Sequence, residues 1–322
     1  MKRIFLLIGV PIFLIAAYFI ADSILFDGFK PKRINEDGFQ GEIFAKAEAK
    51  NQTTVIVLGG GDWAHYWGDQ FVKQGHVALS LPFLGVSGNP NLPEVYPLEY
   101  FEKAISWLGK KPEVNANKIL IMGASRNAEL ALLLASVYPN LIHGVIAYAP
   151  GSVVWSNTVL PYSSDEILPS YTLNGNPIPF IKMEKIKGGD ESIINTIEYW
   201  KKGLESQDSS RTAEIQVEKV NGPILLISGK SDEVWPSSEM ANQIETRAKS
   251  NGFNFNIQNL QYENAGHLIS SNPDSESDTD QRTGEIRLGE KEYEYSFGGT
   301  QVGDNAAKVD AKQKVIDFIN KL

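Results

Sequence analysis

The sequence predicts an α/β domain built on a mostly parallel, doubly wound sheet. Two observations support this fold class. Short apolar runs of strand length alternate with segments whose apolar residues recur at helical spacing, the pattern of a sheet covered by helices on both faces. In addition, the apolar run 119–122 leads through Gly123-Ala124-Ser125 into a helix-like segment at 128–137. A serine at such a strand–turn–helix junction is typical of a nucleophile elbow.

Length and composition limit the function classes. The chain has 322 residues, 42% of them hydrophobic, which is enough for one large domain with a substantial core. Its net charge of −9 argues against a nucleic-acid partner. The sequence contains no cysteine, which excludes disulfides, thiolate metal sites and a cysteine nucleophile. Any catalytic histidine must be one of the four in the chain, which are His65, His76, His143 and His267.

The N-terminus is a separate element. After a short tail at 1–3, residues 4–21 form a charge-free apolar run. A helix of about 18 residues crosses roughly 27 Å of hydrocarbon. We therefore expect a single-pass transmembrane signal anchor, with a linker over 22–40 and the catalytic domain outside the cytoplasm. A cleaved secretory signal, which would leave the protein secreted, and a buried core helix are the alternatives.

The domain over 41–322 is expected to follow in order. The apolar runs predict strands at 41–45, 53–58, 76–81, 119–122, 143–148, 223–228 and 253–260. The helical spacing predicts helices at 98–108, 128–137, 237–250 and 306–322. Between 151 and 218 this alternation stops among prolines and polar residues, which indicates a lid-like insertion. The acidic, serine-rich stretch 270–289 is expected to be a mobile surface loop.

Ser125 is the candidate nucleophile. A serine hydroxyl needs a base to remove its proton, and the start of the following helix offers the N–H of Arg126 to an oxyanion. A Gly-x-Ser triplet is common, so an ordinary helix cap is the alternative reading. The partners of a nucleophile elbow follow it in the order acid and then histidine. The sequence should therefore hold both residues downstream of Ser125.

Both downstream partners have candidates. Asp232 lies in the loop after the strand at 223–228, with Glu233 as a second choice. An acid there would hold the imidazole in one tautomer, whereas the simpler reading is a turn residue that caps the next helix. His267 follows the last strand and completes the order Ser, Asp, His. His76 and His143 each open a strand at the opposite edge, which favours structural roles.

The loop after the first buried strand is expected to complete the oxyanion hole. Three glycines at 59–61 let the backbone approach a substrate, so the N–H of Gly61 or Asp62 is the expected second donor. A phosphate-binding loop would need a following Gly-Lys-Ser/Thr, which the sequence lacks. The polar and aromatic residues that follow are expected to line the substrate entrance, with an ordinary core role as the alternative; these are Trp63, His65, Tyr66 and Trp67.

These motifs resemble the C-terminal catalytic domain of the acyl-CoA thioesterase and bile-acid-CoA:amino-acid N-acyltransferase family, a branch of the α/β-hydrolases. The run 123–129 is similar to the family's G-x-[S/C]-[K/R]-G-[A/G]-E, and 229–237 to its acid loop. Further similarity lies in 98–114, in Ala265-Gly266-His267, and in the closing segment 298–318. Asn127 departs from the family pattern, which has glycine there.

The resemblance implies acyl transfer to water. We expect a serine hydrolase that cleaves small-molecule acyl thioesters, such as acyl-CoA, or carboxylic esters through a Ser125–Asp232–His267 triad. Such a mechanism requires no metal and no organic cofactor. A hydrolase-fold binding protein with impaired catalysis and a peptidase of the same fold are the alternatives. Asn127 motivates the first of them, because its bulk would strain the turn where helix and strand approach closely.

Overall fold

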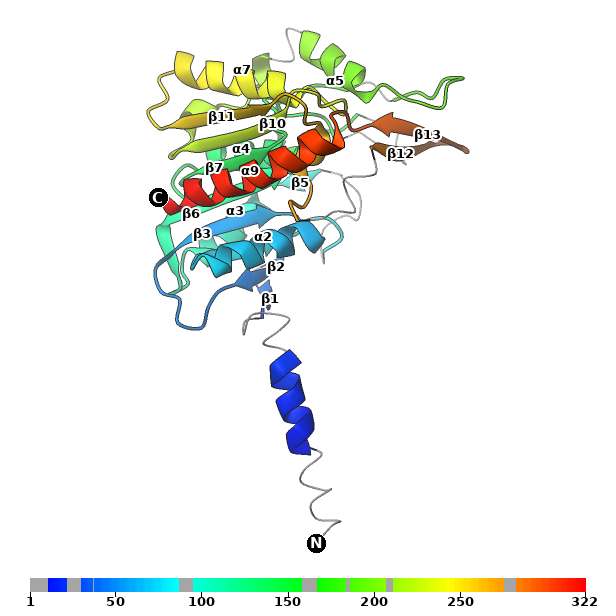
Figure 1. Ribbon diagram of the computed structural model, residues 1–322. Helices are drawn as coiled ribbons and strands as arrows, with labels where there is room; N and C mark the ends of the chain where they lie inside the picture. The colour runs from blue at the N-terminus through cyan, green and yellow to red at the C-terminus, as the bar shows by residue number, and fades with distance from the viewer. Residues whose placement is uncertain are drawn as a thin grey trace.

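The computed structural model describes residues 11–21, 30–36, 38–86, 95–157, 167–183, 186–206, 211–274 and 282–322. An eight-stranded sheet runs through its centre in the order β1-β2-β4-β3-β6-β7-β10-β11 (Figure 1). Its strands are β1 (Lys32–Glu36), β2 (Phe39–Phe44), β3 (Gln52–Leu58), β4 (Val77–Leu81), β6 (Val114–Ala124), β7 (Val145–Tyr148), β10 (Ile224–Gly229) and β11 (Ile257–Tyr262). In this sheet the β1–β2 and β2–β4 pairs are antiparallel, and the other neighbouring strands pair parallel. The predicted mostly parallel α/β sheet is confirmed.

Helices cover both faces of the sheet. One face packs against α2 (Gly61–Lys73) and α9 (Gln301–Asn320), which lie in front of the sheet in Figure 1. The other packs against α3 (Glu99–Leu108), α4 (Arg126–Val137) and α7 (Ser237–Ser250). The strands between them are therefore buried on both sides, as the run Val55–Leu58 shows with no exposed side chain. Such burial explains why these strands read as uninterrupted apolar runs instead of alternating ones.

The parallel strands position the candidate site. β6, β10 and β11 run in the same direction, so their carboxyl ends lie at one edge of the sheet. Ser125 follows β6 directly, whereas Asp232 and His267 lie in the loops after β10 and β11. Ligands of open α/β sheets bind at this edge.

The insertion at 151–218 is packed onto the domain. It contains β8 (Tyr171–Leu173), β9 (Asn176–Pro177), α5 (Thr196–Glu205) and the 3₁₀ helix η1 (Val217–Lys219). β8 pairs with β5 (Tyr96–Pro97), outside the insertion. A hydrophobic cluster joins the insertion to the acid loop and to α7; it consists of Val153, Trp155, Ile181, Met183, Trp200, Ala213, Trp235 and Met240. Within the described residues, the insertion is thus a docked cap, because its core is shared with the domain.

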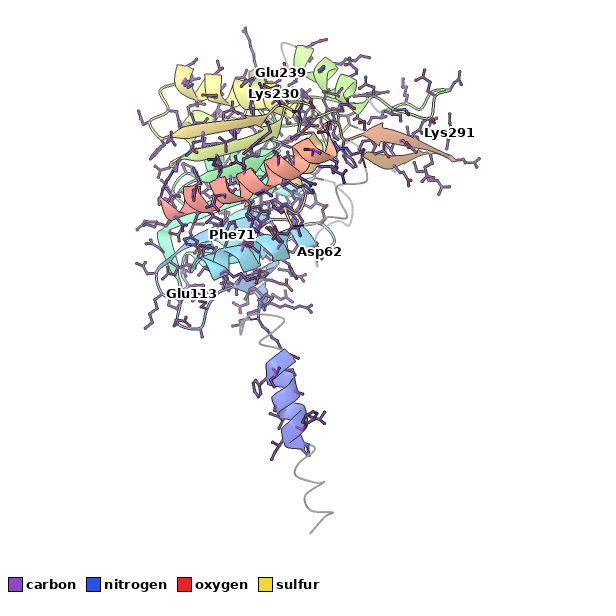
Figure 2. The ribbon with its side chains drawn as sticks, viewed as in Figure 1. Asp62, Phe71, Glu113, Lys230, Glu239 and Lys291 are labelled. Carbon is purple, nitrogen blue, oxygen red and sulfur yellow. The ribbon has the colours of Figure 1, made fainter. Side chains whose placement is uncertain are left out.

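The structure adds β1, α2 and a β-hairpin to the elements that the pattern predicted. β1 lies within the segment expected to be a linker, 22–40, and pairs with β2. α2 begins at Gly61, where we expected a loop and a substrate entrance. A hairpin of β12 (Thr283–Leu288) and β13 (Lys291–Ser296) projects beside the cap, with Lys291 near its tip (Figure 2). Within the expected mobile loop at 270–289, Thr283–Leu288 is therefore strand β12, and Ser270 is the last residue of the 3₁₀ helix η2 (His267–Ser270). Residues 275–281 lie outside the described residues.

The N-terminal run is described only in part. Residues 11–21 are helical and stand apart from the domain in Figure 1, whereas residues 4–10 of the expected span lie outside the described residues. In the part of the chain that the structure describes, no helix is long and apolar enough to cross a membrane.

Candidate active site

Ser125 occupies a strained turn between β6 and α4. Its backbone has φ 56° and ψ −124°, a conformation that non-glycine residues rarely adopt. Its N–H donates to the Tyr148 carbonyl of the neighbouring strand at 2.9 Å, so the turn is fixed to the sheet. A Cβ at Gly123 would overlap the backbone of Asn127, which explains the need for glycine before the serine. The sharp turn expected of a nucleophile elbow is therefore present.

Asn127 does not carry the strain that we expected there. The non-glycine residues with positive φ among those described are Asn51, Ser125, Ala149 and Asn174. Asn127 lies in the first turn of α4, and its side-chain Nδ2–H donates to the Leu58 carbonyl at the end of β3, at 3.3 Å. The expectation of a strained turn at Asn127 is wrong, because the close approach of helix and strand falls on Gly123 instead.

Asp232 and His267 are hydrogen-bonded at the same sheet edge. The Asp232 Oδ2 lies 2.9 Å from the His267 Nδ1, and only 2% of the aspartate side chain is exposed. The Ser237 hydroxyl donates to the same oxygen at 2.7 Å, and the Val234 N–H donates to Oδ1 at 2.9 Å. As a hydrogen-bond acceptor, the carboxylate would keep the proton of a neutral imidazole on Nδ1. The Nε2 of His267 is then the basic nitrogen.

The loop that carries His267 is held by residues that the sequence did not indicate. Asp304 on α9 is fully buried, and its Oδ1 accepts the Gly266 N–H at 2.8 Å. Its Oδ2 pairs with Arg282, whose guanidinium also contacts the Gly298 carbonyl. The His267 N–H donates to the Phe297 carbonyl at 2.8 Å. A local pattern could not predict this, because the contacts join α9 and the start of the hairpin to a distant loop.

The two expected sources of oxyanion donors are helix N-termini. Gly60 is the N-cap of α2, so Gly61 and Asp62 are its first residues; Asp62 is labelled at this end in Figure 2. Arg126 is likewise the first residue of α4. The first N–H groups of a helix have no partner within the helix and carry its positive dipole end. Gly61 has φ 71°, which suits glycine.

The Arg126 side chain binds the cap. Its guanidinium donates to the Ser170 hydroxyl and to Glu129 Oε2, both at 2.7 Å, and to the Trp155 carbonyl at 3.4 Å. Glu129 is fully buried, and its Oε1 accepts the Trp155 N–H at 3.1 Å. Burial raises the pKa of Glu129 to about 7, although the Arg126 charge and the Trp155 N–H oppose this shift. The first turn of α4 therefore fastens the cap beside the elbow.

The four residues expected at the entrance have different environments. Trp67 is fully buried against Phe71 and Tyr148, so its expected place at the pocket rim is wrong. The helix α2, which the sequence did not reveal, turns it into the core. His65 pairs with Glu42 of β2, and Tyr66 packs edge-on against Trp67. Trp63 is half-buried edge-on to Tyr148, the residue whose carbonyl binds the Ser125 N–H.

A series of edge-to-face aromatic contacts links the cap to His267. Trp155 packs on Trp200 of α5 with centroids 4.9 Å apart, and Trp200 packs on Trp235 at 5.2 Å. Trp235, in the acid loop, lies 6.3 Å from the His267 ring. The indole rings thus make one wall that runs from the cap to the imidazole.

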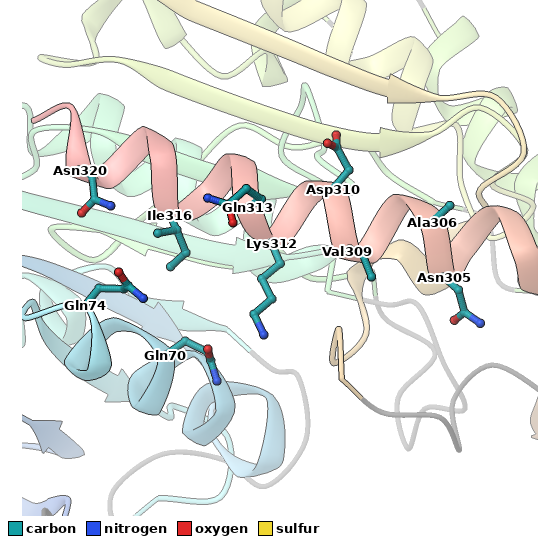
Figure 3. Close-up of a pocket in the computed structure, with 10 residues that line it drawn as sticks. All are labelled: Gln70, Gln74, Asn305, Ala306, Val309, Asp310, Lys312, Gln313, Ile316 and Asn320. Carbon is teal, nitrogen blue, oxygen red and sulfur yellow. The ribbon is translucent and has the colours of Figure 1, made fainter. Parts of the chain in front are cut away.

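A large surface groove lies apart from Ser125, Asp232 and His267. It has a volume of about 990 Å³ between α2 and α9, and Figure 3 shows its ten lining residues, which include Gln70, Lys312 and Asn320. A second depression of about 580 Å³ lies between α7 and the cap. Neither is lined by Ser125, Asp232 or His267, so neither supplies the candidate active site.

Solved structures share this architecture. A dienelactone hydrolase-like promiscuous phosphotriesterase from metagenomic libraries is 12% identical and covers 91% of this chain and 98% of its own, with a TM-score of 0.51. A putative dienelactone hydrolase from Klebsiella pneumoniae is 12% identical over 91% of this chain and 98% of its own, with a TM-score of 0.52. At this identity the likeness concerns the fold alone, which is that of the α/β-hydrolases.

Sequence comparison assigns the chain to one family within this fold. Residues 96–322 match the family model described as BAAT / Acyl-CoA thioester hydrolase C terminal, and the chain belongs to this family. Acyl-coenzyme A thioesterase 1 of Rattus norvegicus is 27% identical over 210 residues, 65% of this chain and 46% of that protein. Acyl-coenzyme A amino acid N-acyltransferase 2 of Mus musculus is 26% identical over 247 residues, 75% of this chain and 55% of that protein. The chain spans about half the length of the curated relatives it matches.

Proposed function

We propose that the protein is a serine hydrolase that cleaves acyl thioesters or esters, with Ser125 as nucleophile, His267 as base and Asp232 as orienting acid. One observation carries the proposal, which is the 2.9 Å contact between the buried Asp232 carboxylate and the His267 Nδ1. It lies at the sheet edge where the strained Ser125 turn stands. A strained nucleophile turn together with a buried Asp–His pair supports acyl transfer more strongly than either feature alone.

The acylation step assigns a role to each group. The Ser125 oxygen attacks the acyl carbon while His267 Nε2 takes its proton, and the carbonyl oxygen becomes an oxyanion. The N–H groups of Arg126 and of Gly61 or Asp62 bind that oxyanion. Collapse of the tetrahedral intermediate expels the thiolate or alkoxide, which receives the proton from His267. The acyl group remains on Ser125.

Hydrolysis of the acyl-enzyme follows the same steps with water as the nucleophile. His267 takes a proton from the water molecule while the water oxygen attacks the ester carbon, and the same N–H groups bind the oxyanion. Collapse releases the carboxylic acid and returns the proton to the Ser125 oxygen. The buried Asp232 stabilises the imidazolium in both steps. A thioester substrate is supported by the names of the relatives, which are acyl-coenzyme A thioesterases and an acyl-coenzyme A amino acid N-acyltransferase.

A hydrolysis screen tests this proposal. Acyl-CoAs of several chain lengths and p-nitrophenyl esters are offered to the wild type, to Ser125→Ala, and to Ser250→Ala as a matched control at the exposed end of α7. We expect Ser125→Ala to lose several orders of magnitude in kcat and Ser250→Ala to keep wild-type activity. Full activity of Ser125→Ala would overturn the triad. A wild type that turns over no substrate and takes no phosphonate label on Ser125 would favour a binding protein instead.

We also propose that residues 4–21 anchor the protein in a membrane with the catalytic domain outside the cytoplasm. The support is the charge-free sequence and the exposure of the large apolar side chains of helix 11–21, such as Phe13 at 71% and Phe19 at 63%. Exposed apolar surface of this kind is unfavourable in water. Carbonate washing should leave the full chain in the membrane fraction, and Phe13→Asp with Ile15→Asp should release it. Release of the wild type by carbonate would contradict the membrane anchor. Failure of external protease to reach the domain would contradict its place outside the cytoplasm.

A further inference from the structure

The end of β3 needs a partner that the sheet does not supply. The ladder between β3 and β6 ends at the pair Val57 and Met122, so the Leu58 carbonyl lies beyond the last paired residue on that side. On the other side the Gly59 N–H still donates to the Leu81 carbonyl at 3.0 Å. The sheet therefore opens between β3 and β6 at the point where the glycine turn and the elbow begin.

Asn127 bridges this opening. Its Nδ2–H donates to the Leu58 carbonyl at 3.3 Å, from the first turn of the helix that follows Ser125. A Cβ at Gly59 would lie 3.0 Å from the same nitrogen, so the amide is packed against the glycine turn. The Ser80 hydroxyl binds the Gly59 carbonyl at 3.2 Å. The peptides that lead into Gly60 and Gly61 are thus held from both sides.

We propose that Asn127 is a positioning residue that fixes the Gly59–Gly61 turn relative to Ser125. The inference rests on the proposed function, since it assigns the turn N–H groups to the oxyanion. Ser125 and Asn127 lie two residues apart on one rigid helix start, so a bond from Asn127 to β3 sets the separation of nucleophile and oxyanion donor. The asparagine thereby adds a contact to β3 that a glycine at this position could not make.

The role of the oxyanion donors predicts which kinetic constant the loss of Asn127 changes. Oxyanion donors bind charge that exists only in the transition state, so their misplacement lowers kcat and leaves KM nearly unchanged. The amide does not titrate, so the pH profile keeps its shape. We expect Asn127→Gly to lower kcat about 5-fold, as for one net hydrogen bond. Asn127→Asp has the same shape but turns an acceptor toward the Leu58 carbonyl, so we expect a loss on the order of 30-fold.

The experiment compares these variants with Asn251→Gly, in which a similar amide–carbonyl bond, from Asn251 Nδ2 to the Arg247 carbonyl at 2.8 Å, is lost at the end of α7. Each is assayed for kcat, KM, unfolding midpoint and affinity for a trifluoromethyl ketone. The Ser125 oxygen adds to the carbonyl carbon of this probe and its proton passes to His267. The carbonyl oxygen of the probe then becomes an oxyanion in the oxyanion hole. Its affinity should fall with kcat in both Asn127 variants and stay unchanged in Asn251→Gly.

The outcomes separate the two proposals. Wild-type kcat and probe affinity in Asn127→Gly, with Ser125→Ala inactive, would overturn the positioning role and leave the triad standing. Activity lost only in proportion to the unfolded fraction would overturn it too. Full activity in Ser125→Ala would overturn the proposed function itself.

Discussion

The buried carboxylate of Glu129 should make the stability of this protein depend on pH near neutrality. Glu129 is fully buried under the cap, where Arg126 and the Trp155 N–H are its partners. Burial raises its pKa from 4.5 to about 7. The informative perturbation is Glu129→Gln, which preserves the shape and one acceptor oxygen and removes the titration.

The sign follows from proton binding. Between pH 4.5 and about 7 the folded state holds a proton on Glu129 that the unfolded state has released. Folding stability attributable to this group therefore falls as the pH rises through that window, and it levels off above it. A shift of this size corresponds to about 3 kcal/mol. The free energy of unfolding of the wild type should thus decline by about 3 kcal/mol relative to Glu129→Gln between pH 4.5 and 7.5.

Denaturant unfolding at half-unit pH steps measures this difference, and other titrating groups cancel between the two proteins. The matched control is Glu198→Gln on α5, because Glu198 is also a helical glutamate paired three residues away, with Lys201 at 3.8 Å, but its side chain is 55% exposed. Its curve should run parallel to that of the wild type. Parallel curves for Glu129→Gln and the wild type would refute the reasoning, since the buried carboxylate would then titrate alike in both states.

Three further outcomes are expected. Asp232→Asn should fold normally by circular dichroism and lose about 10⁴-fold in kcat, since the imidazole would lose its orienting acceptor; a loss under tenfold would contradict this. Asp304→Ala leaves the Gly266 N–H and the Arg282 charge without their partner, so chemical denaturation should show a loss of about 3 kcal/mol in the free energy of unfolding; an unchanged midpoint would argue against the role of Asp304 in holding the His267 loop. Gly123→Ala places a Cβ against the Asn127 backbone, so phosphonate labelling of Ser125 should fail; labelling at the wild-type rate would contradict this.

The local sequence was sufficient to predict elements whose burial is uniform along their length. Apolar runs such as Val55–Leu58 are buried on both faces, so their pattern carries the strand signal directly. The strand signal was weaker where burial is partial. In β12 only Gly284 and Ile286 are buried, so its sequence resembles that of a loop. The helix α2 was missed because it begins at the last of three consecutive glycines, and glycine signals a turn more clearly than a helix start.

The sequence by itself determined the parallel sheet, the elbow at Ser125 and the chain order of Asp232 and His267, because strand runs and turn chemistry are encoded within a few residues. Only the tertiary structure decided which atoms meet. It brought Asp232 to His267, placed Asp304 behind the His267 loop, turned Trp67 into the core, and gave Asn127 a partner at the end of β3. These contacts join residues far apart in the chain, and their geometry follows from how the sheet, helices and cap pack together.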